Sequence, residues 1–97
     1  MKRKYGRFKI HRELVEKGTI APQELKGFMF EVMGKVIVLR AEHRLATDEI
    51  EYEAYSEEFD EIEFGMKVPE YTVAIYTNHD EGGEVSGYSV GFKKMEA

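Results

Sequence analysis

The sequence contains no cysteine, which excludes a disulfide framework, thiol chemistry and zinc held by cysteine ligands. It also lacks any apolar run near the roughly 20 residues that a membrane-spanning helix needs. The basic residues at its start do not lead into the apolar core of a signal peptide. We therefore expect a cytoplasmic protein without a membrane segment.

Sequence motifs of catalysis are missing as well. The three histidines are far apart and occur in no H-x-x-x-H or H-E-x-x-H pattern, and no serine has a G-x-S-x-G context. The many carboxylates follow patterns typical of a solvated face. We assign no catalytic residue, no metal site and no cofactor, and we favour a protein that is not an enzyme.

The chain has the composition of a globular domain. It has 97 residues, of which 42% are hydrophobic and 34% charged, so we expect one domain over residues 1–97. The ends at 1–4 and 93–97 are expected to fray.

The net charge of −5 is unevenly distributed. Residues 2–12 contain six basic residues and no acid, whereas residues 47–65 contain nine acids and no base. Such asymmetry can reflect recognition of a partner. The simpler interpretation, which we favour, is that the basic segment folds back beside the acidic one or that both are solvated.

The stretch Phe28–Tyr55 predicts three consecutive antiparallel strands. Gly34 would begin a two-residue hairpin loop of type II′, and a second turn over 44–47 would pair Arg40 with Glu51. The strand alternation then sorts side chains onto two faces. The apolar face, predicted as core, has Phe28, Phe30, Val32, Ile37, Leu39, Ala41, Ile50, Tyr52 and Ala54. The mixed face has Met29, Glu31, Met33, Val36, Val38, Arg40, Glu42, Glu49, Glu51, Glu53 and Tyr55.

Shorter elements flank this stretch. Tyr5–Ile10 predicts a strand at a sheet edge, and Arg12–Lys17 a short helix closed by a glycine. A continued strand is the alternative at Arg12–Lys17, because Leu14 and Val15 alone do not define a period. A single helical turn is expected at Ala21–Gly27 and another at Ser56–Ile62.

A terminal hairpin is predicted from Tyr71–Asn78 and Glu84–Phe92, with Ile75 opposite Tyr88 and Tyr76 covering Gly87 across the sheet. Together these elements predict an α+β fold: a β-rich, mostly antiparallel sheet of about six strands with one or two short helices. An open sheet, a half-closed barrel and a small sandwich all fit the pattern.

The mixed face is the predicted functional surface, because its apolar residues and methionines are set among charges, as in many interfaces. The first hypothesis is a non-enzymatic protein that binds a partner protein there, in a sharper form as an inhibitor that mimics nucleic acid. Its residues are Met29, Glu31, Val38, Arg40, Glu49, Glu51, Glu53 and Tyr55.

The alternative hypothesis is a homo-oligomer that binds a nucleotide-like anion. Its ligand would lie against a tyrosine and small residues of the terminal hairpin, near a basic side chain. The predicted ligand-binding residues are Arg40, Tyr76, Gly87 and Ser89. Direct binding of nucleic acid by the basic segment is not favoured, because the net negative charge would repel phosphate.

Overall fold

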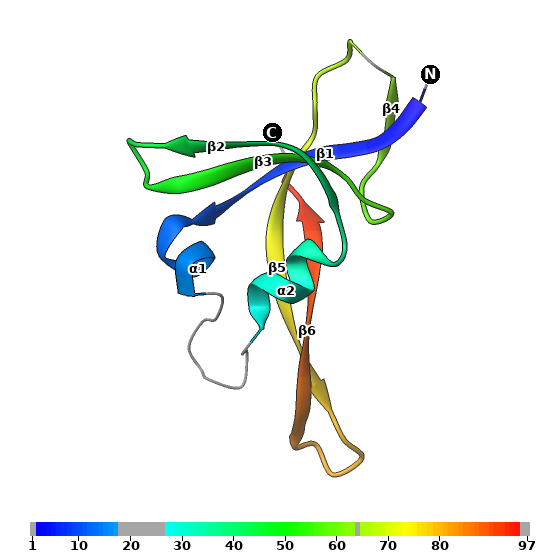
Figure 1. Cartoon of the computed structure of the whole chain (residues 1–97). Coiled ribbons are helices and arrows are strands. Elements are labelled where there is room, and N and C mark those ends of the chain that lie inside the picture. The colour runs from blue at the N-terminus through cyan, green and yellow to red at the C-terminus, as the bar shows by residue number, and fades with distance from the viewer. Residues whose placement is uncertain (1, 18–26, 64, 96–97) are drawn as a thin grey trace.

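The computed structural model describes residues 2–17, 27–63 and 65–95, which form an open, mixed but mostly antiparallel sheet of six strands with two short helices (Figure 1). The strand order is β2-β3-β1-β5-β6, and β4 pairs with the start of β1. The predicted α+β class is confirmed. In chain order the elements are β1 (Lys2–His11), α1 (Arg12–Lys17), α2 (Phe28–Met33), β2 (Ile37–Arg44), β3 (Glu49–Tyr55), β4 (Glu61–Glu63), β5 (Glu70–His79) and β6 (Val85–Lys94).

β1 is the central strand of the sheet, so its predicted edge position is wrong. It pairs antiparallel with β3 and β4 and parallel with β5. The bases that suggested an edge face acids on neighbouring strands: Arg7 is opposite Glu53 and Lys9 is opposite Glu51. The basic segment does fold back beside the acidic one, as we favoured from the charge pattern.

Strands lie close to both ends of the described residues. Lys2–Lys4 pair with Glu61–Glu63, and β6 continues to Lys94. The backbone N–H of Met95 then donates to the Glu70 carbonyl at 2.9 Å.

Residues 28–33 form a helix, which corrects the first of the three predicted strands. Phe28 and Val32, four residues apart on one helix face, are 4% and 0% exposed, whereas Phe30 is 84% exposed. Gly34 ends the helix with φ −69° and therefore begins no type II′ turn, which requires a positive φ there. All the predicted strand pairs between 28–33 and 36–41 are therefore wrong. The prediction failed because a short, mostly apolar segment of six residues fits a helical and a strand period equally.

The second predicted hairpin exists, but its register differs by two residues. Arg40 lies opposite Glu53 rather than Glu51, and a bulge interrupts the pairing between Val38 and Arg40. The turn includes Asp48, whose φ of 54° is left-handed, so the ladder starts one residue later on each strand than predicted. A shift of two keeps side chains on their faces, so the charged residues from Arg40 to Arg44 still share one side. Before the bulge the shift is one residue, so Ile37 and Val38 lie on the faces opposite to those predicted.

The terminal hairpin is confirmed with the same kind of shift. Ile75 is opposite Val90 and Tyr76 is opposite Ser89. The Tyr76 ring covers a strand glycine, as expected, but the glycine is Gly91, where an added Cβ would lie 3.1 Å from the ring. Beyond the body the two strands continue as a projecting ribbon (Figure 1).

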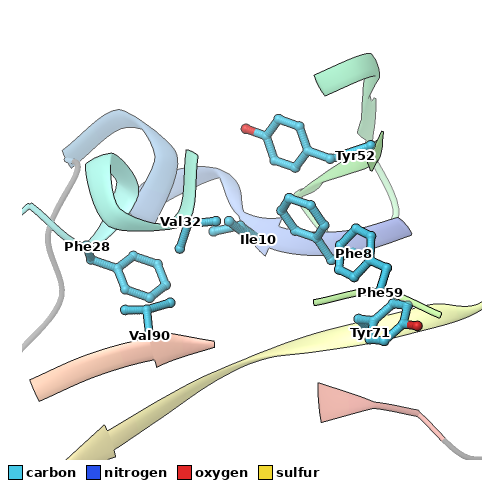
Figure 2. Packing of buried hydrophobic residues seen from close by; sticks show 9 residues of the cluster. Phe8, Ile10, Phe28, Val32, Tyr52, Phe59, Tyr71 and Val90 are labelled. Carbon is cyan, nitrogen blue, oxygen red and sulfur yellow. The ribbon is translucent and has the colours of Figure 1, made fainter. Parts of the chain in front are cut away.

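The core lies on one face of the sheet, between β1, β3, β5, β6 and α2 (Figure 2). Its buried residues are Phe8, Ile10, Phe28, Val32, Tyr52, Ala54, Phe59, Tyr71 and Val90. Five residues of the predicted apolar face are not among them. Phe30, Ile37 and Leu39 are 84%, 68% and 49% exposed, Ala41 is exposed as well, and Ile50 is only partly buried against the core.

The helix predicted at Arg12–Lys17 is confirmed as α1. Ser56 begins a turn, with its hydroxyl accepting the Glu58 N–H at 3.2 Å and Phe59 buried, but the chain then continues as β4 instead of a helix. In the turn predicted at Ala21–Gly27, residues 21–26 lie outside the described residues.

Candidate binding surface on the outer face

The face of β1, β2 and β3 opposite the core, here called the outer face, combines a charged half and an apolar half. Strand alternation creates it: with Phe8, Tyr52 and Ala54 directed into the core, their sequence neighbours are directed outward. The outer face therefore has Tyr5, Arg7 and Lys9 from β1, Arg40, Glu42 and Arg44 from β2, and Glu49, Glu51, Glu53 and Tyr55 from β3.

The charged half is internally paired. Arg44 Nη2 lies 3.0 Å from Glu51 Oε1, and Lys9 Nζ lies 4.0 Å from the other oxygen of the same carboxylate. The hydrogen bond from Arg44, followed by its charge, lowers the pKa of Glu51. Arg40 contacts Glu42 and lies 4.0 Å from Glu53. Glu51 of β3 therefore lies between bases on both neighbouring strands, and Glu53 lies beside a base on β2.

An ion-pair cluster closes the end of this face at the β2–β3 turn. Asp48 accepts two hydrogen bonds from Arg12 Nε, at 2.9 and 3.0 Å, and its Oδ1 lies 2.8 Å from His43 Nε2. The hydrogen bond with Arg12, helped by that with His43, lowers the pKa of Asp48 from 3.8 to about 2. The contact of His43 with Asp48 is diagonal, because in the strand register His43 is opposite Ile50.

The apolar half contains a groove of about 240 Å³ between the starts of β1 and β2, the end of β3, and the β4–β5 loop. Tyr5 and Tyr55 line it, with ring centroids 5.5 Å apart in an edge-to-face arrangement. The Tyr5 hydroxyl donates to Glu53 at 3.1 Å, and burial followed by this carboxylate raises the Tyr5 pKa. The other lining residues are Leu39, Ile62, Glu63, Gly65, Met66 and Val68.

Of the residues that line the groove, the sequence analysis predicted only Tyr55 as part of a functional surface. Leu39 was expected in the core, but the bulge after Val38 breaks the alternation and leaves Leu39 beside Tyr55. Ile62 was expected in a helical turn, and Met66 and Val68 were assigned no role. The groove joins four segments that are distant in sequence, and only the apolar character of 62–68 gave a signal.

The predicted partner-binding residues do not all come together. Arg40, Glu49, Glu51, Glu53 and Tyr55 share the outer face, with Arg40 and Tyr55 at the boundary between its two halves. The other three lie elsewhere: Val38 is opposite the buried Ala54 and so belongs to the other face, Met29 packs against the core from α2, and Glu31 is exposed on α2.

The residues predicted for an anionic ligand are separated. Tyr76 lies opposite Ser89, with Gly87 a diagonal neighbour on the same face of the ribbon. Arg40 is on β2, at the other edge of the sheet, with β3, β1 and β5 between. The Arg40 guanidinium therefore does not lie near the Tyr76 ring, as the alternative hypothesis required.

A second hollow, of about 280 Å³, lies where β1 and β5 diverge after their short parallel contact. Its charged walls include Arg7 and Glu70, whose Nη2 and Oε1 are 2.9 Å apart. The Nε of Arg7 is buried without a hydrogen-bond partner, while Lys9 on the same wall is 4.0 Å from Glu51. Its bases are thus already paired with acids of this chain.

Comparisons with known proteins identify no relative: no protein-family model, curated protein or solved structure matches the chain. Within residues 2–17, 27–63 and 65–95, no helix is long and apolar enough to cross a membrane. The same residues include no group of three or more histidine, aspartate or glutamate side chains placed to hold a metal ion.

Proposed function

We propose that this chain is a non-enzymatic binding protein that docks a partner protein on its outer face. The apolar groove would receive a hydrophobic side chain of the partner, and the neighbouring charges would set its orientation. The observation that carries this proposal is the exposure of large apolar side chains at the groove: Leu39 is 49% exposed and Met66 66%, with Ile37 beside them at 68%.

The size of the groove favours a partner side chain over a small molecule. Pockets for small ligands usually measure about 300–1,000 Å³ and enclose most of the ligand, whereas this groove is open and measures about 240 Å³. A hydrophobic anchor seated in a pocket and ringed by polar contacts is the usual centre of a protein interface. The edge-to-face rings of Tyr5 and Tyr55, which line the groove, would provide an aromatic surface for such an anchor.

The charged half of the outer face is better suited to orienting a bound partner than to mimicking nucleic acid. A phosphate mimic needs carboxylates that are free to meet a basic cleft, but Glu51 and Glu53 lie beside Lys9, Arg44 and Arg40. Paired charges of both signs instead favour a partner with a matching mixed surface, because complementary charges fix register more than they add affinity. We therefore do not extend the proposal to nucleic-acid mimicry.

Site-specific photo-crosslinking tests the proposal. A photo-reactive amino acid at position 66, in the groove, is expected to capture a defined partner from the native cell extract. The same amino acid at position 30 is the matched control, because Phe30 is also highly exposed but lies on α2. Capture at 66 that disappears in Leu39→Glu, with the fold retained by circular dichroism, supports the groove.

Charge reversal separates the two halves of the face. Reversing Glu49, Glu51 and Glu53 to lysine should weaken the captured complex while leaving crosslinking at position 66 detectable at high concentration. Equal capture at positions 30 and 66, or capture unaffected by Leu39→Glu, would rule out the groove as the docking site.

A further inference from the structure

β2 forms a free edge of the described sheet, with a neighbour on one side only. Exposed edges are generally guarded by charged side chains, bulges, proline or short length. The eight-residue strand Ile37–Arg44 has a bulge between Val38 and Arg40 and the charges of Arg40, Glu42 and Arg44, but neither lysine nor proline. Four of the large hydrophobic side chains that are exposed in the described chain lie on it or just after it: Ile37, Val38, Leu39 and Leu45.

The hydrogen bonds of the neighbouring strands establish which β2 groups point out of the sheet. Ser56 N–H donates to Lys4, and Arg12 N–H to Asp48, so even-numbered residues of β1 and β3 bond to each other. Odd-numbered residues of β3 then bond to β2, where their partners Arg40, Glu42 and Arg44 are even-numbered. The N–H and C=O groups of Ala41 and His43 are consequently directed to the free edge.

From this pattern we propose that β2 pairs antiparallel with β2 of a second copy, with Ala41 opposite Ala41 at the two-fold axis. This register puts outward-directed backbone groups opposite one another, as an antiparallel ladder requires. It also places Arg40 opposite Glu42 of the second copy, twice, on the outer face. Both side chains are exposed, at 62% and 41%, and can reach across the seam.

The neighbouring registers are less suitable. A seam centred on Glu42 would place Glu42 opposite itself and Arg40 opposite Arg44, which are repulsive pairs. A seam centred on His43 would pair Glu42 with Arg44 but would involve fewer β2 residues, because the strand ends at Arg44. Centring on Ala41 gives the longest overlap that is self-complementary in charge, with both charge pairs formed within the regular stretch beyond the bulge.

The resulting dimer would join two open sheets into one continuous sheet with both outer faces on the same side. It does not depend on the proposed partner, because the seam uses the backbone edge of β2 and not the groove. One paired edge buries less than the roughly 1,200 Å² of a stable specific interface, so a dimer that dissociates at micromolar concentration is expected.

A charge swap tests the register by sedimentation equilibrium over a range of concentrations. Arg40→Glu and Glu42→Arg each replace two attractive pairs by two repulsive ones, so each should weaken dimerisation by about tenfold or more. The double variant R40E/E42R restores both pairs and should regain the wild-type constant. In the register centred on His43, the double variant would instead place the arginine introduced at position 42 opposite Arg44, and the dimer would stay weak.

Two further measurements guard against misfolded variants. Arg44→Glu is the matched control, since it reverses a charge that also contacts Glu51 but forms no charge pair across the seam in this register. In the unmodified protein, amide exchange at Ala41 and His43 should slow as concentration rises, while exchange at Arg40 and Glu42 should not change. A protein that remains monomeric at millimolar concentration, or a dimer unaffected by either single charge reversal, would overturn the proposal.

Discussion

At the scale of single residues, Gly6 shows how closely the core restricts one position. β1 passes beneath the stacked rings of Phe59 and Tyr71, whose centroids are 4.4 Å apart. A Cβ built on Gly6 would lie 2.6 Å from the Tyr71 ring and 3.0 Å from Phe59. Tyr71 cannot withdraw freely, because its hydroxyl accepts the Asp60 N–H at 2.7 Å.

Replacing Gly6 by alanine should therefore destabilise the protein by about 1–3 kcal/mol, the usual cost of overpacking a core. Gly87→Ala is the control, since no atom lies within 4 Å of a Cβ at that position. Chemical denaturation of both variants gives the comparison. Equal stabilities would show that the ring pair moves aside without cost.

Asp48 combines a backbone role and an electrostatic one. Its φ of 54° is left-handed, which aspartate and asparagine tolerate better than most residues. Its carboxylate joins Arg12 of α1 to His43 of β2, so the charge of one side chain holds the β2–β3 turn against the end of β1.

The lowered pKa of Asp48 has a definite consequence for stability against pH. Because the folded pKa of about 2 lies below the ordinary 3.8, folding favours the charged form. This contribution is complete above pH 3.8 and is lost as pH falls through about 2. Asp48→Asn preserves the turn but cannot titrate. The stability difference between wild type and this variant should shrink between those two pH values, and a constant difference down to pH 2 would contradict the assignment.

At the scale of elements, the segment 28–33 shows the limit of periodicity. Its sequence, FMFEVM, places apolar residues at spacings that suit a strand as well as one helical face. The packing decides: Phe28 and Val32 both reach the core from a helix, which puts Phe30 in solvent.

Two alanine substitutions distinguish these alternatives. Val32→Ala should cost about 2 kcal/mol, since it removes buried methyl groups and leaves a cavity. Phe30→Ala should change the free energy of unfolding by less than about 0.5 kcal/mol, as expected of an exposed position. In a strand with Phe28, Phe30 and Val32 all inward, Phe30→Ala would cost about 3–5 kcal/mol. Thermal or urea unfolding separates these outcomes readily.

Both hairpins show a second limit at this scale. The terminal hairpin and the part of the β2–β3 hairpin from Arg40 to Arg44 were predicted with the correct faces but with a register two residues off. A shift of two leaves the alternation of side chains unchanged, so the hydrophobic pattern cannot detect it. In the β2–β3 hairpin the turn conformation decides it instead, through Asp48, whose left-handed φ the pattern does not predict.

At the scale of the whole molecule, the body is extended by the β5–β6 ribbon, and the principal extents are 48 × 31 × 24 Å (Figure 1). The ribbon joins the core through Tyr71 and Val90, whereas residues 75–84 are exposed. A two-stranded hairpin with little core contact is marginally stable in water.

Hydrogen exchange should therefore separate ribbon and body. Amides around the pair Thr77 and Tyr88 are expected to exchange through local opening, while those around Phe8 and Tyr52 should approach the global free energy of unfolding. Nuclear magnetic resonance on the monomeric protein measures both. Protection of the ribbon amides equal to that of β1 would mean that the hairpin opens only with the entire fold.

The sequence alone determined the class of fold, most strands, the helix α1, and the matching of the basic segment to the acidic one. These properties follow from the local alternation of apolar and polar residues and from the distribution of charge along the chain, both of which can be read from the residue order. Tertiary packing alone decided that 28–33 is a helix, that β1 is central, and that Leu39, Ile62 and Met66 meet Tyr5 and Tyr55 in one groove. Those outcomes depend on contacts between distant segments, and no local pattern specifies which distant segments will meet.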